Sequence, residues 1–205
     1  MKKFILSGGQ TSDPDYSNID INKLTRQYDA FHLSNKDLDR FKETNYASTY
    51  GEITRNGMKE LLKGFNTKDK VFIDLGSGGG KSVVYAVLDN NFKYGVGIEF
   101  SKERHEKAKK LLQKLPNEIS KKIKFIYGDL FNAKLNKVDF VFISNLCFSE
   151  DVNDRLANKL AKEAKPGTII LCSKKLDNPK LKLIETRNVE MTWSSKSTIY
   201  LYEKI

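Results

Sequence analysis

Apolar positions along the chain follow a regular alternation from residue 54 onward. Residues 54–65 place Met58, Leu61 and Phe65 at helical spacing, which predicts an amphipathic helix. Short apolar runs then alternate with longer stretches that repeat at helical spacing. We interpret the runs as strands and the longer stretches as helices. The expected strands cover residues 71–73, 94–98, 123–127, 138–143, 168–172, 184–191 and 198–203, and the expected helices cover residues 54–65, 102–115 and 150–164, with another directly after residue 80.

Strands that alternate with helices predict βαβ units, and hence a parallel sheet with helices on both faces. The last two strands have no helix between them, so we expect an antiparallel pair at the C-terminal edge. The predicted fold class is α/β, with a seven-stranded, mostly parallel, Rossmann-like sheet, in which a ligand binds beyond the carboxyl ends of the strands. Residues 1–49 are polar and indicate a short N-terminal extension, with one or two short helices around residues 21–28 and 36–41, before a domain over residues 50–205.

Length and composition are typical of a globular protein. The chain has 205 residues, 39% of them hydrophobic, which is enough for one domain with a substantial core. No apolar run approaches the ~20 residues of a membrane span, and the apolar stretch of residues 4–6 is too short for a signal peptide. Two cysteines, Cys147 and Cys172, cannot form a disulfide framework, and no His and Cys spacing indicates a metal site. We therefore expect an intracellular, reducing compartment, no membrane partner and no metal.

A glycine-rich segment, Asp74-Leu75-Gly76-Ser77-Gly78-Gly79-Gly80-Lys81-Ser82, follows the first predicted strand. A phosphate-binding P-loop needs a glycine at position 75, where this chain has leucine. A dinucleotide-binding loop needs a third glycine, but both possible frames have another residue there. The remaining interpretation is a loop for S-adenosylmethionine. In that interpretation the Asp74 carboxylate meets the ammonium group of the ligand, and Gly76, Ser77 and Gly78 let the backbone approach its methionine part.

Acidic residues end the first three predicted strands, and this pattern is more specific than the glycines alone. Asp74 ends the first strand, Glu99 the second and Asp129 the third. Glu99 has the position of the carboxylate that binds both ribose hydroxyls in dinucleotide folds. Asp129 is placed to accept a hydrogen bond from the adenine amino group, with Leu130 or Phe131 beside the ring. The pattern therefore predicts S-adenosylmethionine as cofactor, S-adenosylhomocysteine as product, and a class I methyltransferase sheet.

Short words along the chain are more specific still. They occur in one order: Tyr50-Gly51-Glu52-Ile53-Thr54, Asp74-Leu75-Gly76-Ser77-Gly78, Gly97-Ile98-Glu99, Gly128-Asp129, Ser144-Asn145-Leu146-Cys147-Phe148, Cys172-Ser173-Lys174 and Thr192-Trp193-Ser194. Together they resemble the Dot-one (disruptor of telomeric silencing) family, the non-SET histone lysine methyltransferases. The resemblance covers roughly residues 28–205.

The resemblance implies roles for residues outside the glycine segment. Tyr50 and Glu52 would belong to a loop that closes over the cofactor, and Asn145 would contact the cofactor near the transferring methyl group. Leu130 stands where family members carry Phe, which implies weaker stacking on the adenine. The candidate catalytic residues are Asn145, Tyr200, Trp193 and Phe148, the last three because they match aromatic residues near the lysine channel.

The reaction implied by the resemblance is methylation of a lysine on the globular core of histone three. The implied partner is the nucleosome, with ubiquitin as a further candidate, and the implied location is chromatin in the nucleus. We expect a monomer. His32 and His105 lie in polar segments, and we interpret both as surface residues.

The net charge of +10 is concentrated in residues 102–124. Such an excess is typical of proteins that bind polyanions, although a solvated lysine-rich helix would look the same. Two other functions remain open: an RNA or DNA methyltransferase of the same fold, and a non-catalytic nucleosome-binding module. The lysines expected to contact DNA or the nucleosome are Lys102, Lys109, Lys110, Lys114, Lys121, Lys122, Lys174 and Lys175.

Overall fold

The computed structural model of the chain describes residue 16, residues 18–28 and residues 30–205. The apolar stretch of residues 4–6, on which the expectation of no signal peptide depends, lies outside the described residues. Within the described part, no helix has the length and apolar character that crossing a bilayer requires.

Seven strands in the described part of the chain form one sheet, in the order β3-β2-β1-β4-β5-β7-β6. Strands β1 to β5 run parallel, and β7 pairs antiparallel with both β5 and β6. The predicted sheet and its antiparallel C-terminal pair are therefore confirmed. The strands are β1 (Val71–Leu75), β2 (Tyr94–Glu99), β3 (Ile123–Tyr127), β4 (Phe140–Ile143), β5 (Ile169–Cys172), β6 (Leu181–Met191) and β7 (Ser194–Lys204).

Helices begin where a hydroxyl side chain accepts a hydrogen bond from the first turn. Thr54, Ser101 and Ser149 each do so, at the starts of three helices. The helix expected over residues 102–115 ends earlier, at Leu112, and Pro116 begins a separate short helix because proline cannot continue the first one. The helices are α1 (Ile21–Thr25), α2 (Asn35–Glu43), α3 (Arg55–Leu62), α4 (Lys81–Asp89), α5 (Lys102–Leu112), α6 (Asn117–Ser120) and α7 (Glu150–Glu163), with a 3₁₀ turn η1 (Leu130–Asn132).

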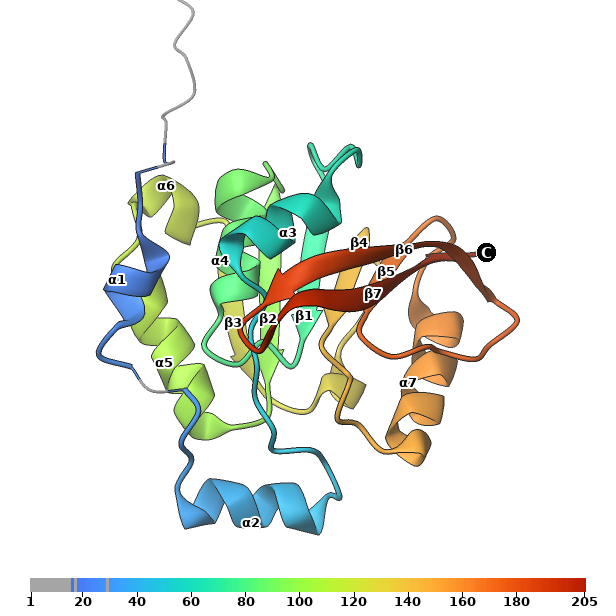
Figure 1. Cartoon of the computed structure of the whole chain (residues 1–205), viewed down its shortest axis with the longest axis horizontal. Helices are drawn as coiled ribbons and strands as arrows, with labels where there is room; N and C mark the ends of the chain where they lie inside the picture. The colour runs from blue at the N-terminus through green and yellow to red at the C-terminus, as the bar shows by residue number, and fades with distance from the viewer. Residues whose placement is uncertain (1–15, 17, 29) are drawn as a thin grey trace, which may run out of the picture.

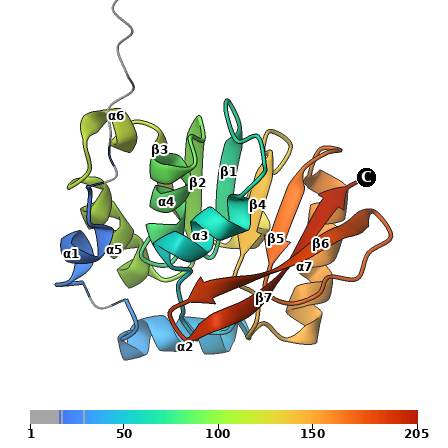
Figure 2. The ribbon, with the colours of Figure 1, turned by 45° about the horizontal axis from the view of Figure 1, so that its top comes forward.

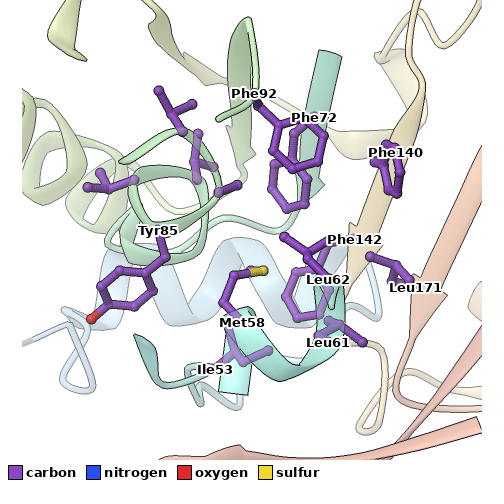
Figure 3. Packing of buried hydrophobic residues seen from close by; sticks show 14 of the residues in the cluster. Ile53, Met58, Leu61, Leu62, Phe72, Tyr85, Phe92, Phe140, Phe142 and Leu171 are labelled. Atoms are coloured by element: carbon purple, nitrogen blue, oxygen red, sulfur yellow. The ribbon is translucent and has the colours of Figure 1, made fainter. Parts of the chain in front are cut away.

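Two hydrophobic clusters hold the helices on the two faces of the sheet. One joins α3, α4 and α5 to one face, and Figure 3 shows Met58, Leu61 and Leu62 of α3 beside Phe142 and Leu171 of the sheet. The other joins α7 to the opposite face of β4 and β5. Figure 1 shows the same layering, with the β6–β7 hairpin at one side of the molecule. Strand β7 begins before the expected strand because its first residues are polar and largely exposed, which hides them from a hydrophobicity pattern, and β6 begins three residues earlier than expected, at Leu181.

Candidate active site

A cleft lies where the carboxyl ends of β1, β2 and β4 meet the segment of residues 41–51. Helix α2 lies across this end of the sheet, at the bottom of Figure 1. The empty space of the cleft is about 720 Å³, counting its open mouth. The parallel sheet thus places its ligand cleft where the topology of such sheets predicts.

The glycine turn after β1 forms one end of the cleft. The backbone amides of Gly76 and Ser77 both donate to the carbonyl of Ile98 at 2.9 Å, which ties the turn to β2. Gly76 has φ +102° and Gly78 has φ +51°, conformations that favour glycine. A Cβ on Gly76 would meet no atom within 4 Å, so open space lies against the backbone at that point.

Asp74 combines burial with an unsatisfied oxygen. Its side chain is 3% exposed. Oδ2 accepts a hydrogen bond from the Ser82 hydroxyl, whereas Oδ1 has no partner among the described residues. Burial raises the pKa of Asp74 to about 7, and the nearby Glu99 carboxylate pushes it in the same direction. A buried carboxylate with a free oxygen beside open backbone fits a ligand ammonium group, which would supply both the missing hydrogen bond and the missing charge.

Glu99, at the end of β2, is held in one orientation by two backbone amides. Ser101 donates to Oε1 and Gly78 donates to Oε2, both at 2.7 Å. Burial raises the pKa of Glu99, although these two donors and the Arg104 charge act against the shift. Each oxygen keeps a lone pair for a further donor. The carboxylate therefore fits a pair of ligand hydroxyls from within the cleft that it lines.

Asp129 is bonded at both oxygens as well. Its Oδ1 accepts from the backbone amide of Phe131 at 2.8 Å, and its Oδ2 accepts from the Tyr46 hydroxyl at 2.9 Å. Leu130 and Phe100 line the cleft beside it. Sequence reasoning missed Tyr46 and Phe100. The signal for Phe100 was its place directly after Glu99, whereas Tyr46 comes from a segment that only the fold brings here.

Tyr50 and Glu52 close over the glycine turn. The Tyr50 hydroxyl donates to Glu52 Oε1 at 2.5 Å and accepts from the Gly79 amide at 2.9 Å. Lys81 forms an ion pair with Glu52 Oε2 at 2.8 Å. A Cβ on Gly78 would lie 2.1 Å from the Tyr50 ring, so the ring packs directly on the backbone of the turn. These contacts hold the loop against the site predicted for the methionine part of the cofactor.

The segments that carry the first and the last words of the family resemblance lie next to each other in the structure. Glu52 donates its amide to the Thr192 hydroxyl at 3.1 Å, and the Thr192 amide donates to the Glu52 carbonyl at 2.8 Å. Trp193 is 45% exposed, and its ring lies against Gly51, where a Cβ would approach it to 2.0 Å. Because Gly51 lines the cleft, Trp193 stands at its rim.

Asn145 is fully buried and bonded through both ends of its amide. Its Nδ2 donates to Asn153 Oδ1 at 2.6 Å, and its Oδ1 accepts from the amides of Ser173 and Lys174 at 2.8 and 3.0 Å. The cleft lining includes its neighbour Ser144 but not Asn145. In this structure Asn145 joins the ends of β4 and β5 to α7, which is a positioning role.

The remaining aromatic candidates differ in their distance from the cleft. Phe148 lines it. Tyr200 does not, because it pairs with Cys172 in the sheet and packs in the cluster beneath α7. Lys175 lies over the Tyr200 ring, with Nζ 5.7 Å from the ring centroid. Phe148 and Trp193 therefore lie at the cleft and its rim, whereas Tyr200 does not line the cleft.

Arg104 was not singled out from the sequence, although it organises the site. It is 4% exposed, its Nε donates to the Ala30 carbonyl at 3.0 Å, and its Nη2 donates to the Ser48 carbonyl at 2.8 Å. Its guanidinium carbon lies 4.5 Å from the centroid of the Tyr50 ring. The interpretation of His105, one residue further, as a surface residue was wrong. It is 8% exposed, since α5 turns it toward Tyr127 of β3, and burial lowers its pKa.

The lysines expected to contact a polyanion fall into two groups. Three of them form local contacts. Lys109 pairs with Glu106, Lys114 donates to the Leu24 carbonyl, and Lys174 donates to the Phe148 carbonyl beside the cleft. The others are exposed and form no ion pair within the described residues. These are Lys102, Lys110, Lys121, Lys122 and Lys175.

Methyltransferases are found both among the known proteins that are similar in sequence and among those that are similar in structure. The model of the family "Histone methylation protein DOT1" matches residues 28–203. A protein-lysine N-methyltransferase of Saccharolobus islandicus is 30% identical over 161 residues, covering 77% of this chain and 91% of that protein. A histone-lysine N-methyltransferase, H3 lysine-79 specific, of Caenorhabditis elegans is 29% identical over 175 residues. That match covers 80% of this chain but 18% of the relative, so the chain spans under a fifth of its length.

Solved structures agree on the fold. The crystal structure of an RNA methyltransferase from Salinibacter ruber in complex with S-adenosyl-L-homocysteine has a TM-score of 0.57 at 25% identity, covering 72% of this chain and 89% of that one. A putative methylase from Haemophilus influenzae has a TM-score of 0.55 at 18% identity, covering 74% and 88%. The chain therefore belongs to the DOT1 family of histone methylation proteins and has the fold of the class I S-adenosylmethionine-dependent methyltransferases.

Proposed function

We propose that this chain transfers a methyl group from S-adenosylmethionine to the side-chain amine of a lysine in a protein. The observation that carries the proposal is the buried Asp74 carboxylate. Its unpartnered Oδ1 lies at the end of β1, beside a glycine turn that leaves open space. Asp74 lines a small hollow beside this turn, and the cleft runs from Gly76 past Glu99 to Asp129. Family membership selects the methyltransferase interpretation of this geometry.

The residues of the cleft fit the parts of the cofactor in order. Asp74 would hold the ammonium group, the Gly76-Ser77-Gly78 turn the methionine backbone, and Glu99 the two ribose hydroxyls. Asp129 would accept from the adenine amino group, with Leu130 and Phe100 beside the ring. When bound, S-adenosylmethionine supplies a methyl group activated by the sulfonium charge.

The protein's own task is to present a neutral amine. A free lysine has a pKa of about 10.4, so roughly one in a thousand is neutral near pH 7.4. An apolar, aromatic approach favours the neutral form because it disfavours the ammonium ion. Phe148 and Trp193 supply such a surface at the cleft and its rim. Alignment and exclusion of water are then the main contributions, and the proton leaves to solvent.

A histone lysine within the nucleosome is the substrate that we propose. Two relatives support it, the H3 lysine-79-specific enzymes of Caenorhabditis elegans and Eremothecium gossypii, the second of which is 31% identical over 140 residues and covers 62% of this chain and 24% of its own length. The net charge of +10 favours a partner that carries DNA. For the same reasons we propose chromatin as its location. The broader class, a protein lysine, is supported by the Saccharolobus relative, of which the chain covers nearly the whole length.

An RNA methyltransferase is the second candidate, because the Salinibacter ruber structure shares the fold and the positive charge suits RNA. Enzymes that methylate exocyclic amines of bases usually carry an Asn/Asp-Pro-Pro-aromatic word after the fourth strand. Here that position is Ser144-Asn145-Leu146-Cys147, without proline. The sequence after β4 therefore favours the protein substrate.

The test uses methyl-labelled S-adenosylmethionine with nucleosomes, free core histones, naked DNA and total RNA in parallel. We expect label on a histone lysine, lost in Asp74→Asn and retained in Asp177→Asn, a matched change at an exposed carboxyl. Label on DNA or RNA alone would overturn the substrate and keep the cofactor site. Binding of S-adenosylhomocysteine without transfer to any substrate would favour the non-catalytic module.

A further inference from the structure

No helix of the described residues lies over one face of β2 and β3. Gly95 and Gly97 face α4 and the glycine turn, since a Cβ at Gly95 would lie 2.7 Å from Val87 and one at Gly97 would lie 2.6 Å from Ser77. Because side chains alternate along a strand, Tyr94 and Val96 point to the opposite face. Figure 2 shows α4 and α5 beside β2 and β3, and α7 further along the sheet beside β5. We call this uncovered surface of β2 and β3 the bare face.

The chain connection that should cover the bare face is too short to do so. Only twelve residues separate Tyr127 of β3 from Phe140 of β4, and their one helical element is the three-residue turn η1. Ala133, Leu135 and Val138 of this crossover pack in one cluster with β1 and with Ile98 of β2, and leave Tyr94 and Ile126 exposed. Parallel sheets are normally covered by helices on both faces, so this surface is an exception within its own fold.

The bare face is apolar and has the dimensions of one helix. Tyr94 is 48% exposed and Ile126 is 37% exposed, and both line a groove together with Val96. Two adjacent strands are about 10 Å wide, close to the diameter of an α-helix. The six residues of β2 extend for about 20 Å, which matches an α-helix of about 13 residues.

The rim of the groove is positively charged. Five exposed lysines line it, and no ion pair within the described residues involves any of them. The one carboxyl in the lining is Asp129, whose oxygens already accept from Tyr46 and Phe131. Lysine on an edge strand such as β3 also discourages strand pairing. That explanation does not account for two of the five lysines, which lie on the crossover between β3 and β4. The five are Lys121, Lys122, Lys124, Lys134 and Lys137.

We propose that the bare face binds an acidic amphipathic helix of a partner protein. Its apolar stripe would cover Tyr94, Val96 and Ile126, and its carboxylates would neutralise the lysine rim. A nucleic acid satisfies the lysines but offers no apolar stripe for Val96 and Ile126, and of the two tyrosines in the lining Tyr127 is already engaged by Arg40. The docked helix would also touch the strand end that lines the cofactor cleft, because Ile98, Gly128 and Asp129 border both hollows. Docking is thereby placed to influence the adenine end of the active site.

The proposal is tested on the full chain by nuclear magnetic resonance titration, which detects weak binding. The probe is a synthetic 14-residue peptide with Leu at helical spacing and Glu elsewhere. We expect shifts confined to amides of residues 94–98 and 121–137, with affinity falling as salt rises. A scrambled peptide of the same composition should bind at least about tenfold more weakly, because it cannot present an apolar stripe.

Variants separate the bare face from general charge. The pair Lys124→Glu and Lys134→Glu should weaken peptide binding at least about tenfold, since two of the five rim charges are reversed. The matched pair Lys180→Glu and Lys182→Glu changes exposed lysines elsewhere and should leave binding unchanged. Equal binding of the scrambled peptide, or no binding of either peptide, would overturn the proposal. Tighter binding of single-stranded or duplex DNA that depends on the same rim lysines would overturn it in favour of a nucleic-acid surface.

Discussion

The affinity for S-adenosylhomocysteine should rise with pH between about 6 and 8, and Asp74 is the reason. Burial raises the pKa of this carboxyl to about 7 in the free protein. The ligand ammonium group binds the carboxylate form, so a proton must leave Asp74 before the pair can form. Deprotonating Asp74 by raising the pH removes that cost in advance.

The magnitude follows from the pKa. With a pKa of about 7, roughly one molecule in eleven has an ionised Asp74 at pH 6 and roughly ten in eleven at pH 8. The association constant should therefore increase by about tenfold over this interval and level off above it. Without ligand the sign for stability is opposite. The folded carboxyl binds its proton more tightly than the unfolded one, so this group's contribution is complete below about pH 4 and is lost as pH rises through about 7.

Calorimetric titration at pH 6, 7 and 8 measures the effect directly. Repeating the titration at pH 7 in two buffers of different ionisation enthalpy should reveal release of about half a proton per ligand bound. Asp74→Asn should bind weakly and lose the pH slope. Glu99→Gln measures how much of the pH dependence of binding comes from Glu99, whose pKa is also raised by burial. A flat wild-type profile, or the same slope in Asp74→Asn, would refute the assignment of Asp74 to the ligand ammonium.

Three further predictions concern the backbone, the loop and the charge. Gly80→Ala should destabilise the protein by about 2–4 kcal/mol in urea unfolding, because φ is +85° and a Cβ would lie 2.4 Å from Phe125. Gly64→Ala has a similar φ of +84° with no atom within 4 Å, so a loss as large there would show that the clash contributes nothing. Lys81→Met should weaken S-adenosylhomocysteine binding several-fold, because Glu52 loses its ion-pair partner. Unchanged affinity in calorimetry would show that the loop carrying Glu52 does not contribute to ligand binding. Nucleosome methylation should fall at least about tenfold from about 50 to 200 mM salt, and a flat response would exclude a DNA-gripping surface.

Local signals explain how much of the fold was predictable. The strands β1, β4 and β5 are buried on both faces, so their apolar runs stand out, and the serine and threonine caps indicate where helices begin. The start of β7 was missed because its first residues are polar and largely exposed. The end of α5 was overestimated by three residues because the apolar pattern continues to Leu115, beyond the last helical turn.

The candidate site likewise contains some residues that local sequence signals indicate and others that they do not. Asp74, Glu99 and Asp129 were predictable because each stands at or just beyond the carboxyl end of a strand, and parallel strands bring these ends to one edge. Asn145 was singled out through the family resemblance, and the structure satisfies its amide entirely within the protein. Nothing in the local pattern indicated Arg104, whose partners lie 56 and 74 residues away along the chain.

What the sequence by itself determined is the sheet, its order of acidic strand ends, and the family, because these depend on residue type and local spacing. The tertiary structure alone decided which side chains surround the cleft. It brought Tyr46 to Asp129, Trp193 to Gly51 and Tyr50 onto the glycine turn. It also left the bare face of β2 and β3 uncovered. Such contacts join residues far apart in the chain, and their free energy comes from packing and burial that no local pattern records.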